Sequence, residues 1–523
     1  TMVDQGAEFL GYSRGSGGNR SLYLEGKLYY NRRFEEHSID GLFLFNMRDK
    51  VMQDASESIL ALPYRDTGIA GRLSYGFRDT YFGEFNFGYN GSENFKRGYR
   101  FGFFPSFAVG WLLSNEPFME SVHPISKLKL RGSWGLVGND KLANDVRFSY
   151  LSTIESVPGY RFGYTNNVGY GGYREGRFGV EDLTWETSTK VNVGVELGLW
   201  NSIDLQVDMF KEHRKDIFMA RKTIPEILGY NQMPWANFGQ VDNKGFEVQL
   251  AVNHSFQEDF IVSARGSFTY AKNTIIEYDE PEDLKATTRA RTGQPMNQHF
   301  GLIAEGLFTD DDFIDIQRGI LKPEIPVHTF GRVRPGDIKY KDLNDDSIID
   351  SFDESPIGKP YVPEIIYGFG FNMKYKNVDF GVFFQGTGNF TNMLHGATLI
   401  PGSGGGGTGN VYSNVDNRWT PENPRQDVFW PRLSNIESQN NMRYSTWWIR
   451  DASYLRLKNL EVGYTLTQDW VRSASIRNLR LFIRGTNLLT FAKFKMWDPE
   501  IGSQNGLKYP LQKITTCGLE ITF

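Results

Sequence analysis

The chain has 523 residues, of which 40% are hydrophobic, 15% aromatic and 23% charged. The net charge of -5 gives no electrostatic footprint for nucleic acid, and the single cysteine, Cys517, excludes an intrachain disulfide framework and a thiolate zinc site. The mean hydropathy of -0.44 and the lack of an apolar run of about 18 residues exclude transmembrane helices. No signal peptide is expected at Thr1–Asp4, which has neither a basic nor an apolar region.

Apolar and polar residues alternate along much of the chain. Every second residue is apolar in Val191–Leu199, and the same alternation recurs in Phe246–Val252 and Cys517–Phe523. A period of two is typical of β-strands that have one apolar and one polar face. Taken in chain order, the alternation predicts about 15 strands, at residues 21–34, 38–53, 67–78, 80–91, 101–114, 124–138, 187–200, 202–217, 239–256, 258–272, 363–377, 378–390, 452–466, 476–490 and 512–523.

The links between these strands alternate between short and long. Tight turns are expected at Asp79, Asn201 and Asn377, whereas long loops separate strands elsewhere, as between residues 272 and 363. Long strands with short turns at one end and long loops at the other are typical of outer-membrane β-barrels. We therefore predict an all-β fold, a transmembrane antiparallel β-barrel with long extracellular loops. Its apolar column would face lipid and its polar column the lumen, because hydrocarbon tolerates only a closed sheet.

The predicted strand count is odd, so the two ends of the meander would lie on opposite sides of the membrane. The first strand would also lack a partner. We therefore expect residues 1–523 to be the carboxy-terminal portion of a larger barrel. One irregularity is expected as well: the apolar positions change phase between Leu457 and Leu460, which predicts a β-bulge near Asn459.

Several segments resemble the SusC/RagA family of TonB-dependent outer-membrane transporters, which is found in Bacteroidota. These segments are spread over essentially the whole chain: Tyr81–Phe95, Arg100–Pro105, Gly110–Trp111, Arg131–Gly135, Gly138–Asp140, Leu183–Glu186, Asp451–Leu460 and Gly485–Thr490. The final Phe523 also resembles the terminal aromatic residue that the outer-membrane insertion machinery reads.

This resemblance implies a barrel of about 22 strands with an amino-terminal plug domain. The plug and the first strands would lie outside this chain. The resemblance further implies a Gram-negative outer-membrane protein that is surrounded by lipid and lipopolysaccharide and draws energy through TonB, ExbB and ExbD. A SusD-like surface lipoprotein would close over the barrel, in a dimer of such pairs. The implied cargo is an oligosaccharide or a peptide, and no catalysis is implied.

The long loops carry aromatic residues that suit ligand capture. The apolar faces of sugar rings stack on aromatic side chains, while the sugar hydroxyl groups require hydrogen bonds. The alternative for each aromatic residue is that it packs the loops together or against the lipoprotein. Because tryptophan rings suit flat sugar faces, they slightly favour an oligosaccharide over a peptide. The candidate ligand-binding residues are Tyr160, Tyr170, Trp235, Phe300, Trp419, Trp430, Trp447 and Trp448.

One acidic segment, Asp342–Asp353, has the spacing of a cation-binding loop. Its oxygen-bearing side chains stand where an EF-hand loop places Ca²⁺ ligands, although Ser347 replaces the usual glycine and Asp353 the usual glutamate. The sequence leaves two interpretations open: a loop that binds Ca²⁺, and an acidic turn that is only solvated. The candidate metal ligands are Asp342, Asn344, Asp346, Asp350 and Asp353.

The function that these features favour is TonB-dependent active import of glycans with a SusD-like partner. The alternatives are import of oligopeptides, a passive porin, or the scaffold of an adhesin. An outer-membrane lipase is not expected, because Gly11–Gly15 matches the nucleophile-elbow pattern without the helix that must follow it.

Overall fold

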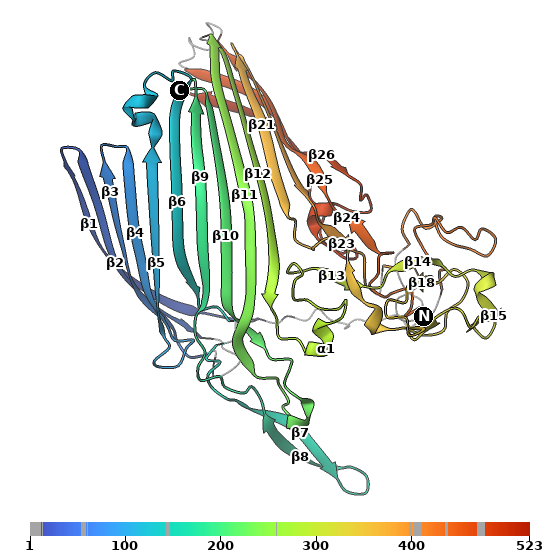
Figure 1. Cartoon of the computed structure of the whole chain (residues 1–523). Helices are drawn as coiled ribbons and strands as arrows, with labels where there is room; N and C mark the ends of the chain where they lie inside the picture. The colour runs from blue at the N-terminus through green and yellow to red at the C-terminus, as the bar shows by residue number, and fades with distance from the viewer. Residues whose placement is uncertain are drawn as a thin grey trace. The chain divides into compact units, whose positions relative to one another are not determined.

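The computed structural model describes residues 12, 14–53, 59, 61–142, 147–257, 259–396, 399–401, 411–434, 438–467 and 476–523. Fifteen long strands form one sheet in the order in which they occur in the chain (Figure 1). They are β1 (Asn19–Phe34), β2 (His37–Met52), β3 (Tyr64–Phe77), β4 (Tyr81–Ser92), β5 (Phe101–Leu112), β6 (Ile125–Asn139), β9 (Glu186–Leu199), β10 (Ile203–Ala220), β11 (Trp235–Gln257), β12 (Phe260–Glu277), β21 (Ile365–Tyr375), β22 (Val378–Gly388), β25 (Tyr454–Leu466), β26 (Asn478–Ala492) and β27 (Ile514–Thr522).

The remaining elements are short and lie in the links. Two-stranded pairs are formed by β7 (Ile154–Phe162) with β8 (Val168–Glu175), β13 (His299–Gly301) with β20 (Ser355–Ile357), β14 (Ala304–Leu307) with β18 (Ile338–Tyr340), β15 (Phe313–Asp315) with β16 (Ile320–Leu321), β17 (Val327–His328) with β19 (Ile348–Ile349), and β23 (Thr391–Met393) with β24 (Ile449–Asp451). The described helices are α1 (Glu282–Lys285) and 3-10 turns at Leu113–Asn115, Pro117–Met119, Glu226–Leu228, Asp310–Asp312, Ser351–Asp353 and Pro499–Ile501. Within the described residues, no helix has the length and apolar character needed to cross a membrane.

Each predicted strand coincides with one long strand of the sheet, which confirms the all-β prediction. The ends differ most where the alternation is imperfect: β11 begins at Trp235 and β12 continues to Glu277. The turns were also predicted correctly. Arg78 and Asp79 have φ values of 55° and 49°, and Trp200 and Asn201 have values of 52° and 53°. Two successive left-handed residues match the twist of the flanking strands, so the hairpins close in very few residues.

The predicted bulge is confirmed and falls at Lys458. The register between β25 and β26 shifts between Leu457 and Asn459, and the register between β22 and β25 shifts at the matching point. Because one extra residue reverses the alternation, Leu457 and Leu460 both stay on the same face of the sheet.

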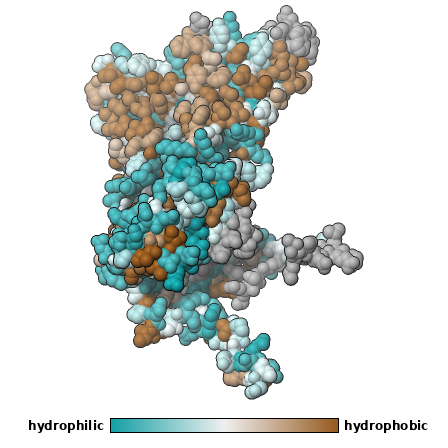
Figure 2. All heavy atoms as spheres, turned by 90° about the vertical axis from the view of Figure 1, so that its right-hand side faces the viewer, coloured by the Kyte–Doolittle hydropathy of each residue, from teal (hydrophilic) through white to brown (hydrophobic). Residues whose placement is uncertain are grey.

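The chain divides into two compact units, and each is described by itself. The first comprises residues 1–111, 133–190 and 214–239 and holds the meander β1–β5 and the hairpin β7–β8. The second comprises residues 112–132, 191–213 and 240–523. In the second unit, β13, β14, β18, β23 and β24 lie together beyond one end of β21, β25 and β26 (Figure 1). On the side that Figure 2 shows, hydrophobic residues gather over the strands and hydrophilic residues over these loops.

The two faces of the sheet differ in character. In the second unit, Val248 pairs with Phe268 on what we call the apolar face, whereas Glu247 pairs with Thr269 on the polar face. The polar face is held by ion pairs between neighbouring strands. Arg480 of β26 contacts Asp379 of β22 and donates a hydrogen bond of 2.6 Å to Glu461 of β25. Each such pair gives a charged side chain of the polar face a partner of opposite charge on a neighbouring strand.

The sheet ends in β1 and β27, and no pairing between these two strands occurs among the described residues. All 16 residues of β1 are exposed. The backbone donors and acceptors on the outer edges of both strands therefore lack a neighbouring strand among the residues that the structure describes.

Candidate functional site

The loops of the second unit have a hydrophobic core of their own. We call this cluster the loop core, and most of it comes from residues 302–430. Its buried members are Leu302, Leu307, Ile338, Tyr340, Ile349, Ile357, Met393, Leu394, Leu399, Ile400, Trp419, Val428, Trp430, Trp448 and Phe494. Because so many large side chains are removed from water together, the loops form a packed layer above the strands.

Three predicted ligand-binding tryptophans belong to this loop core. Trp430 is 0% exposed, and its ring lies 5.6 Å from that of Tyr412 and 6.0 Å from that of Trp448. Trp419 and Trp448 are buried as well. The structure thus shows these three rings in packing contacts, which is the alternative that the sequence left open. Trp447 is partly buried against the same core, and its Nε1–H donates to the carbonyl oxygen of Phe429 at 3.1 Å.

A polar network runs through the loop core and centres on Asp337. This carboxylate is fully buried and accepts two hydrogen bonds from Arg432, at 3.0 and 3.1 Å, and one from Asn441 at 2.8 Å. Burial raises the pKa of Asp337, while Arg432 and the hydrogen bonds oppose that rise. Nearby, Nδ1 of His328 lies 2.8 Å from Oδ1 of Asn440, and burial lowers the pKa of this histidine to about 4.

No sequence motif predicted this network. Asp337 and Arg432 are almost a hundred residues apart, and neither stands in a recognisable spacing with the other. The one available signal was the isolated Asp337 between Gly336 and the alternating Ile338–Tyr340, since a charge beside buried residues requires a partner.

The other predicted aromatic residues lie in different surroundings. In the first unit, Tyr160 and Tyr170 face each other across the β7–β8 hairpin and are 71% and 62% exposed. Both pack edge-on against Phe162, at 5.0 and 5.8 Å. Trp235, also in the first unit, stacks on Phe218 at 4.9 Å and is partly buried. Phe300 of the second unit lies under the guanidinium group of Arg291, at 4.9 Å.

The acidic segment forms a tight loop whose carboxylates bind backbone N–H groups. Asp342 accepts hydrogen bonds from the backbone of Asn344, Asp345 and Ser347, and Asp346 accepts one from Ile348. Asp350 accepts one from Phe352, and the buried Asp353 accepts one from Leu343.

These carboxylates therefore stabilise the turn itself, because each accepts a hydrogen bond from a backbone N–H group that would otherwise need another acceptor. Among the described residues, no group of three or more histidine, cysteine, aspartate or glutamate side chains is arranged to hold a metal ion. Ca²⁺ binding by Asp342, Asn344, Asp346, Asp350 and Asp353 stays a prediction. Ser13, of the nucleophile-elbow match, lies outside the described residues.

The polar face of the second unit carries two hollows lined by charged residues. One, of about 470 Å³, is lined by Lys127, Glu196 and Asp204 among others, and a second, of about 410 Å³, by Arg265 and Glu461. Several of these side chains form ion pairs: Lys127 lies 2.7 Å from Glu196, and Glu461 lies 2.6 Å from Arg480. The polar face thus offers hydrogen-bonding groups of both signs to whatever lies against it, without an excess of either charge.

Comparisons with known proteins agree with this architecture. The family described as "TonB dependent receptor-like, beta-barrel" matches residues 64–488. TonB-dependent receptor P3 of Formosa agariphila is 28% identical over 482 residues, which are 87% of this chain and 45% of that receptor. TonB-dependent receptor SusC of Bacteroides thetaiotaomicron is 25% identical over 468 residues, which are 87% of this chain and 43% of SusC.

A solved structure described as the RagAB peptide transporter shares the fold. It superposes with a TM-score of 0.72 at 20% sequence identity, over 97% of this chain and 55% of that one. The resemblance predicted from the sequence is thereby confirmed. The chain spans about half the length of the curated relatives that it matches.

Proposed function

Because this chain belongs to the TonB dependent receptor-like β-barrel family, we propose that it forms the membrane-spanning part of a transporter that actively imports oligosaccharides. The family consists of transport proteins of the Gram-negative outer membrane rather than enzymes. The match over residues 64–488 carries the proposal, because it covers the strands from β3 to β26.

We further propose that additional protein segments and partner proteins complete the transporter. A sheet in hydrocarbon must be closed, so additional strands would join the edge strands β1 and β27, and a plug domain would fill the lumen. A SusD-like lipoprotein would cover the loops, TonB with ExbB and ExbD would supply energy, and two such pairs would associate. The mixed charges of the polar face suit contact with a polar plug, since donors and acceptors of both signs are present.

The cargo would meet the exposed aromatic residues first. Tyr160 and Tyr170 are 71% and 62% exposed, and each hydroxyl group can hydrogen-bond. An aromatic ring with an adjacent polar tip matches the alternating apolar faces and hydroxyl groups of a sugar chain. The β7–β8 hairpin therefore supports the proposal that the cargo is an oligosaccharide.

Import of oligopeptides is the second candidate, and burial of the tryptophans favours it. The prediction of a sugar rested on the loop tryptophans Trp419, Trp430, Trp447 and Trp448, yet three of these rings are buried in the loop core and Trp447 is partly buried against it. The exposed candidates that remain include Tyr160 and Tyr170, and tyrosine serves peptides as well as sugars.

Uptake experiments test these proposals. Cells that express the complete transporter with its lipoprotein should accumulate labelled oligosaccharide, and deletion of TonB should abolish the uptake. Undiminished uptake without TonB would instead establish a passive porin. Tyr160→Ala with Tyr170→Ala should weaken binding of the oligosaccharide pool, whereas the matched Tyr160→Phe with Tyr170→Phe, which keeps both rings, should weaken it less. Competition by a peptide pool but not by oligosaccharides would assign the cargo to peptides.

A further inference from the structure

A groove crosses the apolar face of the second unit near the strand ends that carry the long loops. It has a volume of about 850 Å³ and is lined mainly by residues of β11, β12, β21, β22, β25 and β26. Its lining includes Phe268, Phe369, Leu455 and Phe491, and strand register places all four on the apolar face. In a barrel of this family that face contacts lipid, so the groove opens towards acyl chains.

The groove arises because two positions of the apolar face have no side chain. Gly266 of β12 and Gly388 of β22 both line it. A Cβ atom added at Gly266 would meet no atom closer than 3.8 Å, and one added at Gly388 none closer than 3.6 Å. The glycines are therefore not required by close packing of the strands, and a larger residue would simply fill the hollow.

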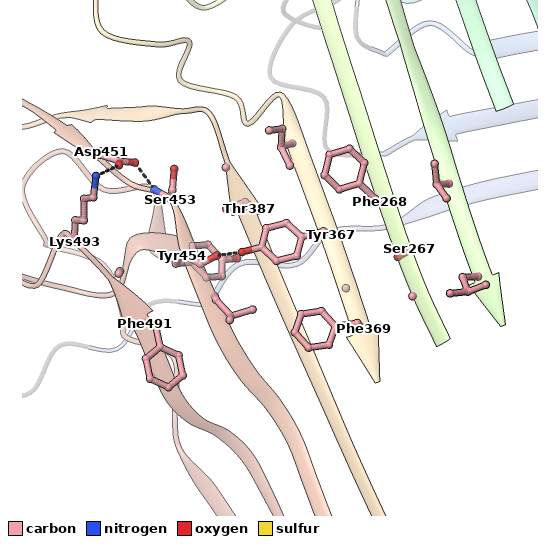
Figure 3. A pocket seen from close by; sticks show the side chains of 18 residues that line it. Ser267, Phe268, Tyr367, Phe369, Thr387, Asp451, Ser453, Tyr454, Phe491 and Lys493 are labelled. Carbon is pink, nitrogen blue, oxygen red and sulfur yellow. Dashed lines mark hydrogen bonds and ion pairs between the residues drawn. The ribbon is translucent and has the colours of Figure 1, made fainter. Parts of the chain in front are cut away.

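At its loop end the groove continues into a second, charged cavity. Asp451 and Lys493 line both, and Figure 3 shows them together at one end of the groove, with Phe369 and Phe491 farther along the strands. The second cavity has a volume of about 670 Å³ and is lined by three cations, Arg450, Lys493 and Lys495, but by the single carboxylate Asp451.

The two lysines are available to a ligand. Lys493 is 86% exposed, and its Nζ lies 3.5 Å from Asp451, a surface ion pair that a stronger anion can replace at little cost. Lys495 is exposed and has no carboxylate partner in the part of the chain that the structure describes. Arg450 is held in place by its own hydrogen bonds to the carbonyl oxygens of Trp447 and Ile449, at 2.6 and 2.8 Å.

We propose that the groove and the charged cavity together bind a phosphorylated, multiply acylated glycolipid of the outer leaflet. An acyl chain would lie in the groove, and a phosphate group would lie between Lys493 and Lys495. The long loops mark the extracellular side, so these lysines stand at the headgroup level of the outer leaflet. Their apolar stems can lie along the strands while the charged ends reach the phosphate.

The charge balance selects this ligand class over other lipids. A zwitterionic or uncharged lipid would leave the excess cations of the cavity without a counter-charge, whereas a lipid phosphate supplies one. The inference needs only the lipid-facing sheet and does not depend on the cargo, so it can fail or succeed independently of the transport proposal.

Native mass spectrometry of the complete transporter, extracted from outer membranes into mild detergent, tests the assignment. The probes are diphosphoryl lipid A and phosphatidylethanolamine, added in turn after delipidation. We expect retention of lipid A only. Lys493→Glu with Lys495→Glu should weaken that retention by at least about thirtyfold, because two favourable surface charges are lost and two carboxylates that repel the phosphate replace them. The conservative Lys493→Arg with Lys495→Arg should keep it.

A second pair of variants locates the acyl chain. Gly266→Leu should fill the groove and reduce retention of lipid A. The matched control is Gly83→Leu in β4, where an added Cβ atom would also meet no atom within 4 Å; it should leave the retention unchanged. A heat-modifiable band on electrophoresis shows that each variant is folded. Equal retention of both lipids, wild-type retention by the double glutamate variant, or equal loss from the two leucine variants would overturn the proposal.

Discussion

Replacing Trp430 by alanine separates a packing role from a ligand-binding role. The ring is 0% exposed, stacks on Tyr412, and donates from Nε1 to Oδ1 of Asn414 at 3.2 Å. Removal of a fully buried tryptophan costs about 3–5 kcal/mol, and the lost aromatic pairs lie within that sum. We therefore expect Trp430→Ala to destabilise the loop core by about 4 kcal/mol.

Hydrogen exchange measures this loss at defined amides. The backbone N–H of Trp419 donates to the carbonyl oxygen of Trp430 at 3.0 Å, and that of Leu302 donates to Tyr444 at 2.8 Å. If the loop core opens as one unit, about 4 kcal/mol corresponds to exchange about a thousandfold faster at both amides. Amides in the middle of β22 should exchange as before, because their partners lie in neighbouring strands.

The matched control is Trp200→Ala, at a hairpin turn where the ring is 62% exposed. It should leave the loop amides unchanged. The reasoning fails if Trp430→Ala leaves loop exchange unaltered while it weakens cargo binding. That result would mean that the ring turns towards ligand instead of holding the loops together.

Three further predictions concern other parts of the second unit. The pKa of His328 is about 4 in the folded protein, whereas that of an unfolded histidine is about 6.5, so protonation favours the unfolded loops. The contribution of His328 to the stability of the loops should be fully present above about pH 6.5 and should fall by up to about 3 kcal/mol as the pH approaches 4. Exchange at Val327–His328, corrected for intrinsic rates, measures this loss, and His328→Phe should remove this histidine's contribution to the loss. Arg432→Met leaves Asp337 charged and buried, so the loops should lose about 3–5 kcal/mol and become sensitive to protease, and adding Asp337→Asn should restore part of the loss. Deletion of Lys458 removes the extra residue and leaves Leu457 and Leu460 two positions apart on the apolar face, so the heat-modifiable band should persist. Deletion of Val382, which lies in a regularly paired part of β22, should reverse the alternation beyond it and abolish the band; loss of the band on deletion of Lys458 would contradict the bulge assignment.

The strands were predictable because alternation is a local property that the sheet preserves. Residues 21–34 and 378–390 each correspond to a strand with nearly the predicted ends, since each apolar column must face one side whatever the neighbours are. The bulge was also predictable, because an extra residue changes the phase of the apolar positions between Leu457 and Leu460. Short loop strands such as β13 and β18 were missed, since three residues are too few to show a period.

The candidate site was less predictable because residue type does not determine exposure. Trp430 and Tyr160 both stand in long loops and were given the same role, yet one is buried and the other is mostly exposed. The difference depends on contacts with residues far away in the chain, such as Leu302 and Ile338, which share the loop core with Trp430. Lys493 and Lys495 were missed for a related reason. They continue the alternation of β26 beyond its end, and only the fold shows that Arg450 and the groove lie beside them.

The separation of buried and exposed aromatic residues decides where ligand binding can be tested cleanly. A substitution at Trp419, Trp430 or Trp448 removes loop-core packing, so weakened cargo binding in such a variant would not distinguish unfolded loops from a lost contact. The Tyr160–Tyr170 pair lies outside that core, in a hairpin whose strands are held by backbone hydrogen bonds that alanine preserves. A loss of cargo binding there, with loop-core exchange unchanged, can therefore be assigned to the rings themselves.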